Sequence, residues 1–458
     1  MPIDARCRVH YRGPVAPPFR ATEPPGSRLD ISTTGGKMPV KTTSRIFVFV
    51  AFTLAATRLA FPADAAPQSP PDPKSTWQVG TPIVTYYAGP AMSEAVATQM
   101  ADGGFNVVWC GEKDLDLLQK HALRGMLHDP LLSPASLDSP PQLQKLDALI
   151  VRVRAHPAFY SYYITDEPSA SAFPALGKVV AHLKEKDPAH MAYINLFPTY
   201  ATNEQLGTKG DKVPAYREYL RQYFEVVKPA LVSYDHYQFY KAADTHEYFL
   251  NLDLVRKASQ DAGVPFLNIV QAAAWQPDVR VPSADETRYL VYTTAAYGAQ
   301  GISYYVYTAP GHEGGIAAAN GTPTPIYATL KTLNPEFVAV ATELQPLRSL
   351  AVYHTTMKDP GCIPLPPNSP FHPTAAGPEA NARGLLLGYF ARPDTAADKP
   401  THVVVVNLDY KSEARTTLIG PAGLEVFNAT TGKWSAANGA RADLVLPPGG
   451  GKLVRVGQ

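Results

Sequence analysis

One strand and one helix can be read in residues 158–188, AFYSYYITDEPSASAFPALGKVVAHLKEKDP. The first part, from Phe159 to Glu167, is rich in Tyr and is typical of a β-strand. In the second part the apolar residues recur at helical spacing until Asp187 and Pro188, at Phe173, Leu176, Val179, Val180 and Leu183. A strand followed by an amphipathic helix is the unit from which parallel sheets are built.

The same alternation extends from Thr81 to Gly311. Eight apolar or aromatic runs are separated by helical patterns, and they lie near Ile83, Val107, Met126, Tyr163, Ile194, Ser233, Ile269 and Tyr304. With a closing helix after Ile326, this pattern predicts a (β/α)8 TIM barrel over residues 81–344. A doubly wound open sheet is the alternative, but no Gly-rich phosphate loop follows the first strand.

Residues 345–458 have a different pattern, with short strand-like runs and no helical intervals. The runs are LAVYHTT, RGLLLGYFAR, THVVVVNLDY, TTLIG, LEVFNATTGKW, ADLVLPP and KLVRVG. Turn residues such as Gly420 and Pro421 separate them, which predicts a small C-terminal β-sandwich. The segment from Asp359 to Arg383, rich in Pro and Ala, is expected to be a long loop.

The beginning of the chain has the features of a secretory signal. A basic region after Met38 precedes the apolar run IFVFVAFTLAA at 46–56 and the small-residue site Ala-Asp-Ala at 63–65. We therefore expect translation to start at Met38, residues 1–65 to be a leader, and 66–80 to be a linker. An uncut membrane anchor is the alternative, but the run is short against the roughly 20 residues that span a bilayer. The expected location is secreted or periplasmic, with no membrane attachment after cleavage.

Composition sets limits on the partners. The chain has 458 residues, which favours two domains, and its 41 Lys+Arg and 40 Asp+Glu give a net charge of +1. This balance, without a long basic run, does not favour nucleic acid as a partner. Cys110 and Cys362 could form a disulfide or remain buried thiols. No CxxC or HExxH motif occurs, so neither a metal nor a cofactor is expected.

Acidic residues stand where two of the predicted strands end, and active sites of such barrels lie at those ends. On the fourth strand, residue alternation groups Glu167 with Tyr163 on the face toward the barrel mouth. The same alternation turns Asp166 toward the helices. Pro168 is expected to keep Glu167 extended at the rim. On the sixth strand Asp235 is expected to point inward with Ser233 and Tyr237.

Two carboxyl groups on either side of a glycosidic bond are sufficient to hydrolyse it, one as general acid and the other as nucleophile or base. Glu167 is the predicted acid, with a pKa that burial among Tyr side chains would raise. Asp235 is the predicted partner, and Asp166 either orients Glu167 or acts directly. A separation of roughly 5 to 10 Å between the two carboxyl groups would support hydrolysis.

Several motifs carry a resemblance to a known group of enzymes. HPAFYSYYITDEPS, DPAHMAYINLFPTY, LVSYDHYQFY and YGAQGISYYVY resemble the barrels of secreted bacterial glycoside hydrolases. The resemblance is to the clan that contains β-galactosidases, in a poorly characterised subgroup with a DEP motif. It implies that Glu167 is the acid/base and that the substrate is an oligo- or polysaccharide. The clan's second glutamate, at the end of the seventh strand, is replaced here by Gln271.

Two further functions remain open. The Asp166–Glu167 pair is similar to that of substrate-assisted N-acetylhexosaminidases, where the Asp holds the acetamido group, and Tyr234–Asp235 is similar to a pair in chitinase-like families. A non-catalytic carbohydrate-binding barrel is the other alternative, since fold does not fix function. The acids could also be structural, Asp166 and Glu167 by capping the next helix and Asp235 as a buried ion-pair partner.

Other strand-end side chains are candidates for contacts with the substrate. They are Asp129, Asn195, Tyr237, Gln271, Trp275, Tyr305 and Tyr307. Trp275 offers an aromatic face on which a sugar can stack, whereas Trp109 is expected to pack in the core. Glu313, in a Gly-flanked loop, is a reserve candidate for the second carboxylate.

Overall fold

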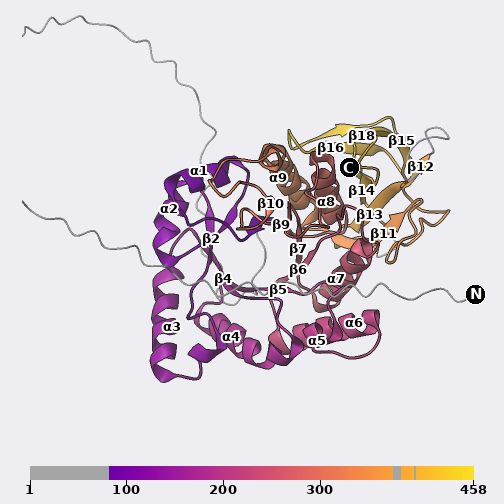
Figure 1. Cartoon of the computed structure of the whole chain (residues 1–458). Coiled ribbons are helices and arrows are strands. Elements are labelled where there is room, and N and C mark those ends of the chain that lie inside the picture. The colour runs from indigo at the N-terminus through magenta and orange to yellow at the C-terminus, as the bar shows by residue number, and fades with distance from the viewer. Residues whose placement is uncertain (1–81, 375–382, 397–398, 458) are drawn as a thin grey trace, which may run out of the picture. The chain divides into compact units, whose positions relative to one another are not determined.

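The computed structural model describes residues 82–374, 383–396 and 399–457, which belong to one compact unit (Figure 1). The predicted leader at 1–65 and linker at 66–80 lie outside these residues. Among the helices of the described ranges, none combines the length and the apolar character needed to cross a membrane.

Eight parallel strands form the first sheet, and each contains one of the eight predicted runs. They are β1 Ile83–Tyr87, β2 Val107–Cys110, β3 Arg124–Leu127, β4 Phe159–Asp166, β5 Met191–Leu196, β6 Val232–His236, β7 Phe266–Gln271 and β9 Gly301–Tyr305. Their spatial order is β1-β9-β7-β6-β5-β4-β3-β2. From β2 to β9, each of these strands thus lies beside the one that precedes or follows it in the sequence, and the last strand, β9, lies beside the first, β1. This order confirms the TIM barrel and excludes the doubly wound sheet.

The barrel is completed between β1 and β2 by one asparagine. The backbone N–H of Asn106 donates to the Val84 carbonyl (3.1 Å), and the Asn106 side-chain oxygen accepts from the Val84 N–H (2.9 Å). Because Asn106 directly precedes β2, these two bonds join the outer strands of the sheet.

Helices surround the strands (Figure 1). They are α1 Glu94–Asp102, α2 Leu115–Lys120, α3 Pro140–Val153, α4 Phe173–Lys186, α5 Asn203–Leu206, α6 Lys212–Gln222, α7 Tyr248–Ala262, α8 Ala284–Ala296 and α9 Pro325–Leu344. Single turns of 3-10 helix at Glu112–Asp114, Pro134–Ser136 and Ala170–Ala172 and a π-helical turn at Tyr223–Val227 accompany them. In α4 the buried side chains include all five that the periodicity selects, Phe173, Leu176, Val179, Val180 and Leu183.

The β-sandwich follows α9. One sheet has the order β11-β13-β14-β19-β16-β17 and the other β12-β15-β18. Their bounds are β11 Arg348–His354, β12 His372–Thr374, β13 Leu385–Ala391, β14 His402–Asn407, β15 Ala414–Ile419, β16 Leu424–Asn428, β17 Lys433–Ala436, β18 Arg441–Leu446 and β19 Gly451–Val456. The predicted run LEVFNATTGKW is a hairpin of β16 and β17, because its ATTG segment makes a turn. The predicted long loop contains β12, which pairs with β15.

The sandwich packs closely on the barrel at one glycine. A Cβ on Gly388 of β13 would lie 2.0 Å from the carbonyl oxygen of Ala296, the last residue of α8. The contact therefore requires glycine. Cys110 is buried and Cys362 partly buried, and both are free thiols, so the possible disulfide is not formed.

Candidate active site

Three acidic side chains, Asp166, Glu167 and Asp235, meet at the C-terminal ends of β4 and β6, and one amide from β5 joins two of them. The side-chain nitrogen of Asn195, on β5, donates to Asp166 Oδ1 (3.0 Å) and to Asp235 Oδ1 (2.8 Å). Its oxygen accepts from the Ser233 hydroxyl (2.9 Å), which also contacts the Tyr193 hydroxyl (2.7 Å). Both amide protons are therefore directed at carboxylates, and the amide orientation is determined by Ser233.

The carboxyl groups of Glu167 and Asp235 are neighbours, and each acts on the pKa of the other. Asp235 is only 3% exposed and Glu167 is partly buried. Burial raises the pKa of Glu167 first, and the charges of Asp235 and Asp166 raise it further. Burial likewise raises the pKa of Asp235, followed by the charge of Asp166. Two neighbouring carboxyl groups that are removed from water resist ionising together, so one of them keeps its proton at a pH where an exposed carboxyl group has lost it.

Asp166 does not face the helices, as strand alternation predicted. The Tyr87 hydroxyl donates to Asp166 Oδ2 (2.6 Å), and Asn195 contacts its other oxygen. The pairing of β4 with β5 shifts register between Tyr163 and Thr165, which is a β-bulge, and the shift changes the alternation beyond it. Burial raises the pKa of Asp166, and its two hydrogen bonds oppose that rise.

The backbone of Glu167 also differs from the prediction. Its φ is +43°, in the left-handed region, rather than extended. The Glu167 N–H donates to the Asn195 carbonyl (2.8 Å), so the residue still follows the β5 edge. Successive residues of a regular strand face opposite sides, and this turn allows Asp166 and Glu167 to reach the same cluster. Pro168 contributes because it disfavours the right-handed helical region for the residue before it.

Aromatic side chains surround the acids, and we call them the aromatic rim: Tyr87, Trp109, His128, Tyr163, Tyr237, Trp275 and Tyr305. Ring centroids are 4.0 Å apart for Trp109 and His128 and 4.0 Å apart for His128 and Tyr163. Tyr237 lies 4.8 Å from Trp275 and 4.9 Å from Tyr305, which stacks on Tyr87 at 5.5 Å. Except for Tyr237, each member is partly exposed, including Trp109, which was expected to be a core residue.

Three predicted substrate contacts have other partners in the structure. Gln271 is fully buried, and its amide is bound by the backbone of Phe239 and Arg280. Tyr307 is also fully buried, and its hydroxyl donates to Gln99 of α1, on the helix side of the barrel. Asp129 accepts a bond from the Leu131 N–H (2.9 Å) and closes a turn. The backbone partners of Gln271 come from loops, and the side-chain partner of Tyr307 from α1; the sequence predicts neither arrangement.

The remaining candidates have separate outcomes. Four predicted substrate contacts lie at the acid cluster or in the aromatic rim: Asn195, Tyr237, Trp275 and Tyr305. Tyr234 does not, because it is fully buried among the tyrosines behind the strands. Glu313, on the short strand β10 (Glu313–Gly314) that pairs with β8 (Ala273–Ala274), is exposed. Tyr87 and His128 stand at strand ends, and the alternation of β4 grouped Tyr163 with Glu167, but the sequence did not lead us to assign substrate contacts to these three residues.

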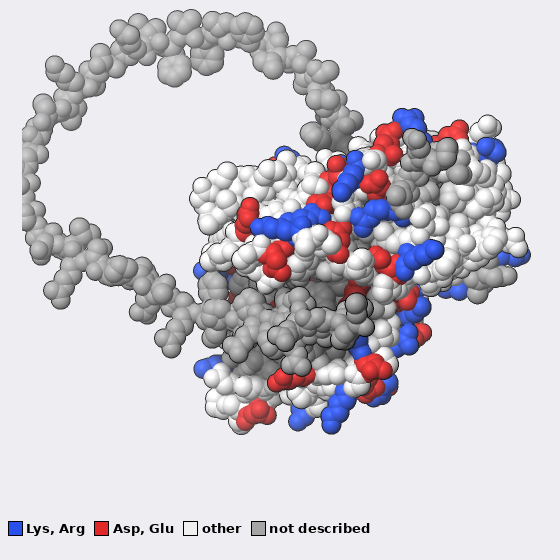
Figure 2. All heavy atoms as spheres, turned by 45° about the vertical axis from the view of Figure 1, so that its right-hand side comes forward, with Lys and Arg blue, Asp and Glu red and all other residues white. Residues whose placement is uncertain are grey.

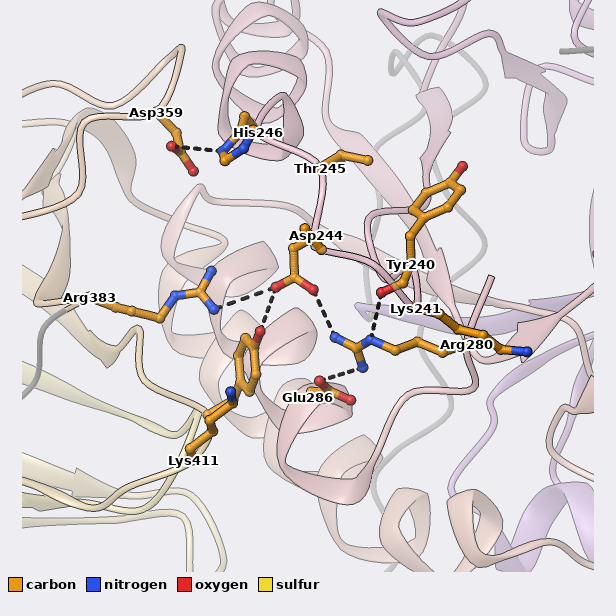
Figure 3. A pocket seen from close by; sticks show the side chains of 12 residues that line it. Tyr240, Lys241, Asp244, Thr245, His246, Arg280, Glu286, Asp359, Arg383 and Lys411 are labelled. Atoms are coloured by element: carbon orange, nitrogen blue, oxygen red, sulfur yellow. Dashed lines mark hydrogen bonds and ion pairs between the residues drawn. The ribbon is translucent and has the colours of Figure 1, made fainter. Parts of the chain in front are cut away.

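A polar pocket of about 440 Å³ lies beside the loop that follows β6 (Figure 3). Asp244 is at its centre, and the Arg280 guanidinium (2.8 Å) and the Tyr410 hydroxyl (2.5 Å) contact its two oxygens. Arg280 also forms an ion pair with Glu286 (2.5 Å), and Arg383 of the sandwich forms one with Asp244 (3.5 Å). The charges are paired with one another, so this network joins barrel and sandwich. Elsewhere on the face seen in Figure 2, positive and negative side chains of the described residues are interspersed.

No protein-family profile and no curated protein sequence matches the chain. Among solved structures, it is similar to a GH27 β-L-arabinopyranosidase from Geobacillus stearothermophilus (8% identity, 82% of this chain and 97% of that one, TM-score 0.45). It is also similar to a β-galactosidase from the psychrophilic Marinomonas ef1 (13% identity, 58% of this chain, TM-score 0.43), of which it spans 62%. A third is a mannanase catalytic domain from Streptomyces sp. SirexAA-E (11% identity, 61% and 96%, TM-score 0.39). The fold itself is established by the strand pairing described above.

Proposed function

We propose that the protein is a secreted or periplasmic glycoside hydrolase in which Glu167 is the general acid and Asp235 the second carboxyl group. The observation that carries the proposal is the placement of the Glu167 and Asp235 carboxyl groups side by side at the C-terminal ends of β4 and β6, where burial and the neighbouring acids raise the pKa of both. A general acid must be protonated at the working pH, and a pKa raised by burial and neighbouring charge is the usual means.

Asp235 fits the role of the second group. Asn195 holds one of its oxygens, and the groups that interact with its charge include Asp166, Glu167 and the hydroxyls of Tyr234 and Tyr237. While Glu167 holds the proton, Asp235 is the carboxylate, and its negative charge would stabilise an oxocarbenium-like transition state or activate water as Glu167 gives its proton to the leaving oxygen.

The spacing of the pair requires one movement. The two carboxyl groups are direct neighbours in the structure, whereas roughly 5 to 9.5 Å separates the pair that flanks a glycosidic bond. The Glu167 side chain must therefore rotate away from Asp235 when a sugar enters, and its carboxyl group then donates a hydrogen bond to the glycosidic oxygen. The final separation would decide between retention and inversion.

The aromatic rim supports a carbohydrate as the substrate class. The partly exposed rings of Trp275 and Tyr305 on one side, and of Trp109 and Tyr163 on the other, offer flat apolar area of fixed orientation. Sugars expose C–H groups on one face, which such rings can cover.

A second candidate function is substrate-assisted hydrolysis of an N-acetylhexosaminide. One observation favours it: Asp166 lies in the same cluster as Glu167 and is hydrogen-bonded to Tyr87, so it could exchange that bond for an acetamido N–H. In that case the acetamido oxygen would be the nucleophile, and Asp235 would not be needed for bond cleavage.

The test is hydrolysis of aryl glycosides and of plant and microbial polysaccharides by the purified protein without residues 1–65. Glu167→Gln is expected to lose at least about a hundredfold in rate, the usual scale for a general acid. Asp235→Asn should lose as much on an ordinary sugar, whereas Asp166→Asn should be the more damaged variant if only N-acetyl substrates react.

Glu185→Gln is the matched control, because it changes an exposed glutamate of α4, on the outside of the barrel. Its rate should equal that of the parent protein. Full activity of Glu167→Gln would remove Glu167 from the mechanism. Saccharide binding without any release would instead favour the carbohydrate-binding barrel.

A further inference from the structure

A second cavity, of about 880 Å³, lies at the opposite end of the barrel from the acid cluster. Met191 and Phe266, which begin β5 and β7, line it, as do the end of α7 and the start of β11. Because parallel strands all begin at the same end, this cavity cannot belong to the site at the strand ends.

The lining of this cavity is basic. Lys184, His190, Lys228, Arg256 and Arg348 line it, and among the described residues that line it there is no Asp or Glu. His190 already contacts Asp187 outside the lining (2.8 Å). The other four cations have no ion-pair partner within the cavity, so its interior is positive and suits a negative ligand.

Arg256 is the main feature. It is only 4% exposed, and its Nε donates to the Ser349 hydroxyl (2.9 Å), while its Nη2 is buried without a hydrogen-bond partner. The hydroxyl of Ser259, one turn further along α7, and the side-chain oxygen of Gln300 are also buried without partners in the described structure. The charge of Asp253 acts on Arg256, but no acid is hydrogen-bonded to the guanidinium in the described structure. A buried guanidinium left partly unpaired is costly, so its free N–H group points to a missing anion.

Structural roles do not account for this arrangement. The bond to Ser349 uses only Nε, and the nearest acid on α7, Asp253, is engaged by Lys257 (2.6 Å). Arg256 also lies six residues before Ala262, the end of α7, where the helix dipole no longer stabilises a cation strongly.

We propose that this cavity binds a small molecule through a phosphate or sulfate group held by Arg256 and Ser259. Arginine binds such oxyanions through paired N–H donors, and the serine hydroxyl adds a third. The rings of Tyr297 and Phe390, which also line the cavity, would contact the rest of the molecule. Lys184 at the rim adds attraction at longer range.

The experiment measures thermal unfolding and titration calorimetry with sodium phosphate and with phenyl phosphate, against sodium chloride at equal ionic strength. At about ten times Kd, the ligand should raise the Tm by about 2 °C. Tighter binding of phenyl phosphate would identify an organic ester as the ligand class, and equal binding would identify the free ion. No rise and no heat with either probe would overturn the proposal.

Variants locate the site. Arg256→Gln should abolish binding, and Ser259→Asp should also abolish it by supplying an internal partner to Arg256, without lowering the Tm. Ser259→Asp keeps the test valid if Arg256→Gln does not fold. Lys184→Ala should weaken binding about threefold, whereas Lys178→Ala, an exposed lysine of the same helix outside the cavity, should leave it unchanged. Phosphate binding that survives Ser259→Asp would refute the assignment, and none of these outcomes depends on hydrolysis.

Discussion

Replacing Glu167 by Gln should stabilise the protein above neutral pH. Burial and the charges of Asp235 and Asp166 raise the pKa of Glu167 in the folded state. Above about pH 4.3, the ordinary pKa of glutamate, the unfolded chain releases this proton while the folded chain keeps it. The unfolding free energy therefore falls as pH rises from that value toward the raised pKa. Gln is neutral at every pH and similar in shape to Glu, so the unfolding free energy of the variant does not fall with pH for this reason.

The magnitude follows from proton linkage. One proton bound only in the folded state changes the unfolding free energy by about 1.4 kcal/mol per pH unit, or about 4 kcal/mol from pH 5 to 8. Asp235 shares the proton, so we expect Glu167→Gln to recover about half, about 2 kcal/mol at pH 8 and close to none near pH 4.5. Catalysis and stability would then oppose each other at this residue.

Urea unfolding at pH 5 and pH 8, followed by tryptophan fluorescence, measures the effect. Glu112→Gln is the control, because hydrogen bonds from Arg152 lower the pKa of this exposed glutamate. The ionised Glu112 carboxylate stabilises the folded protein at every pH above the pKa of glutamate in the unfolded chain. Replacing it by Gln should therefore not raise the unfolding free energy at pH 8. A gain for Glu167→Gln that is equal at both pH values, or a loss at pH 8, would refute the account of the pair.

Three other substitutions test separate parts of the structure. Tyr87→Phe removes the hydrogen bond to Asp166 and should reduce stability by about 1 kcal/mol and raise the Asp166 pKa, measurable by carboxyl NMR titration. Burial lowers the pKa of His354 to about 4, so between pH 6.5 and 4 only the unfolded chain takes up a proton on this histidine. His354→Phe should therefore reduce the loss of unfolding free energy over that range, which urea midpoints measure. Gly388→Ala should lower the Tm through about 3 kcal/mol of overlap with the Ala296 carbonyl, and an unchanged Tm would refute the close contact.

The fold could be predicted from the sequence because its signals are local and repeated. The helical spacing in α4 and the aromatic run of β4 depend only on neighbouring residues. Eight such units leave few arrangements, since parallel strands with right-handed crossovers close into a barrel. The divided strands β16 and β17 and the short β12 were missed because a turn and a brief edge pairing leave weak patterns.

The candidate site was predictable only where regular alternation holds. Asp235 points inward from β6, whose pairing with β7 is regular. Asp166 was assigned to the wrong face because the bulge in β4 depends on the pairing with β5, which no local pattern encodes. Gln271 stands at a strand end, yet its amide is held by backbone groups from two distant loops. Contacts of this kind depend on the tertiary path of the chain.

The charge state of the acid cluster follows from what surrounds it. Asp235 and Asp244 are nine residues apart, and Asp244 contacts two arginines while, within the described ranges, no Lys, Arg or His forms an ion pair with Asp235, Asp166 or Glu167. A cation would keep such carboxyl groups ionised; burial beside other acids makes one of them keep its proton. The adjacency of Asp166 and Glu167, turned to one side by a bulge and a left-handed residue, thus places carboxyl groups where burial favours a retained proton, whereas Asp244 and other acids of the chain form salt bridges.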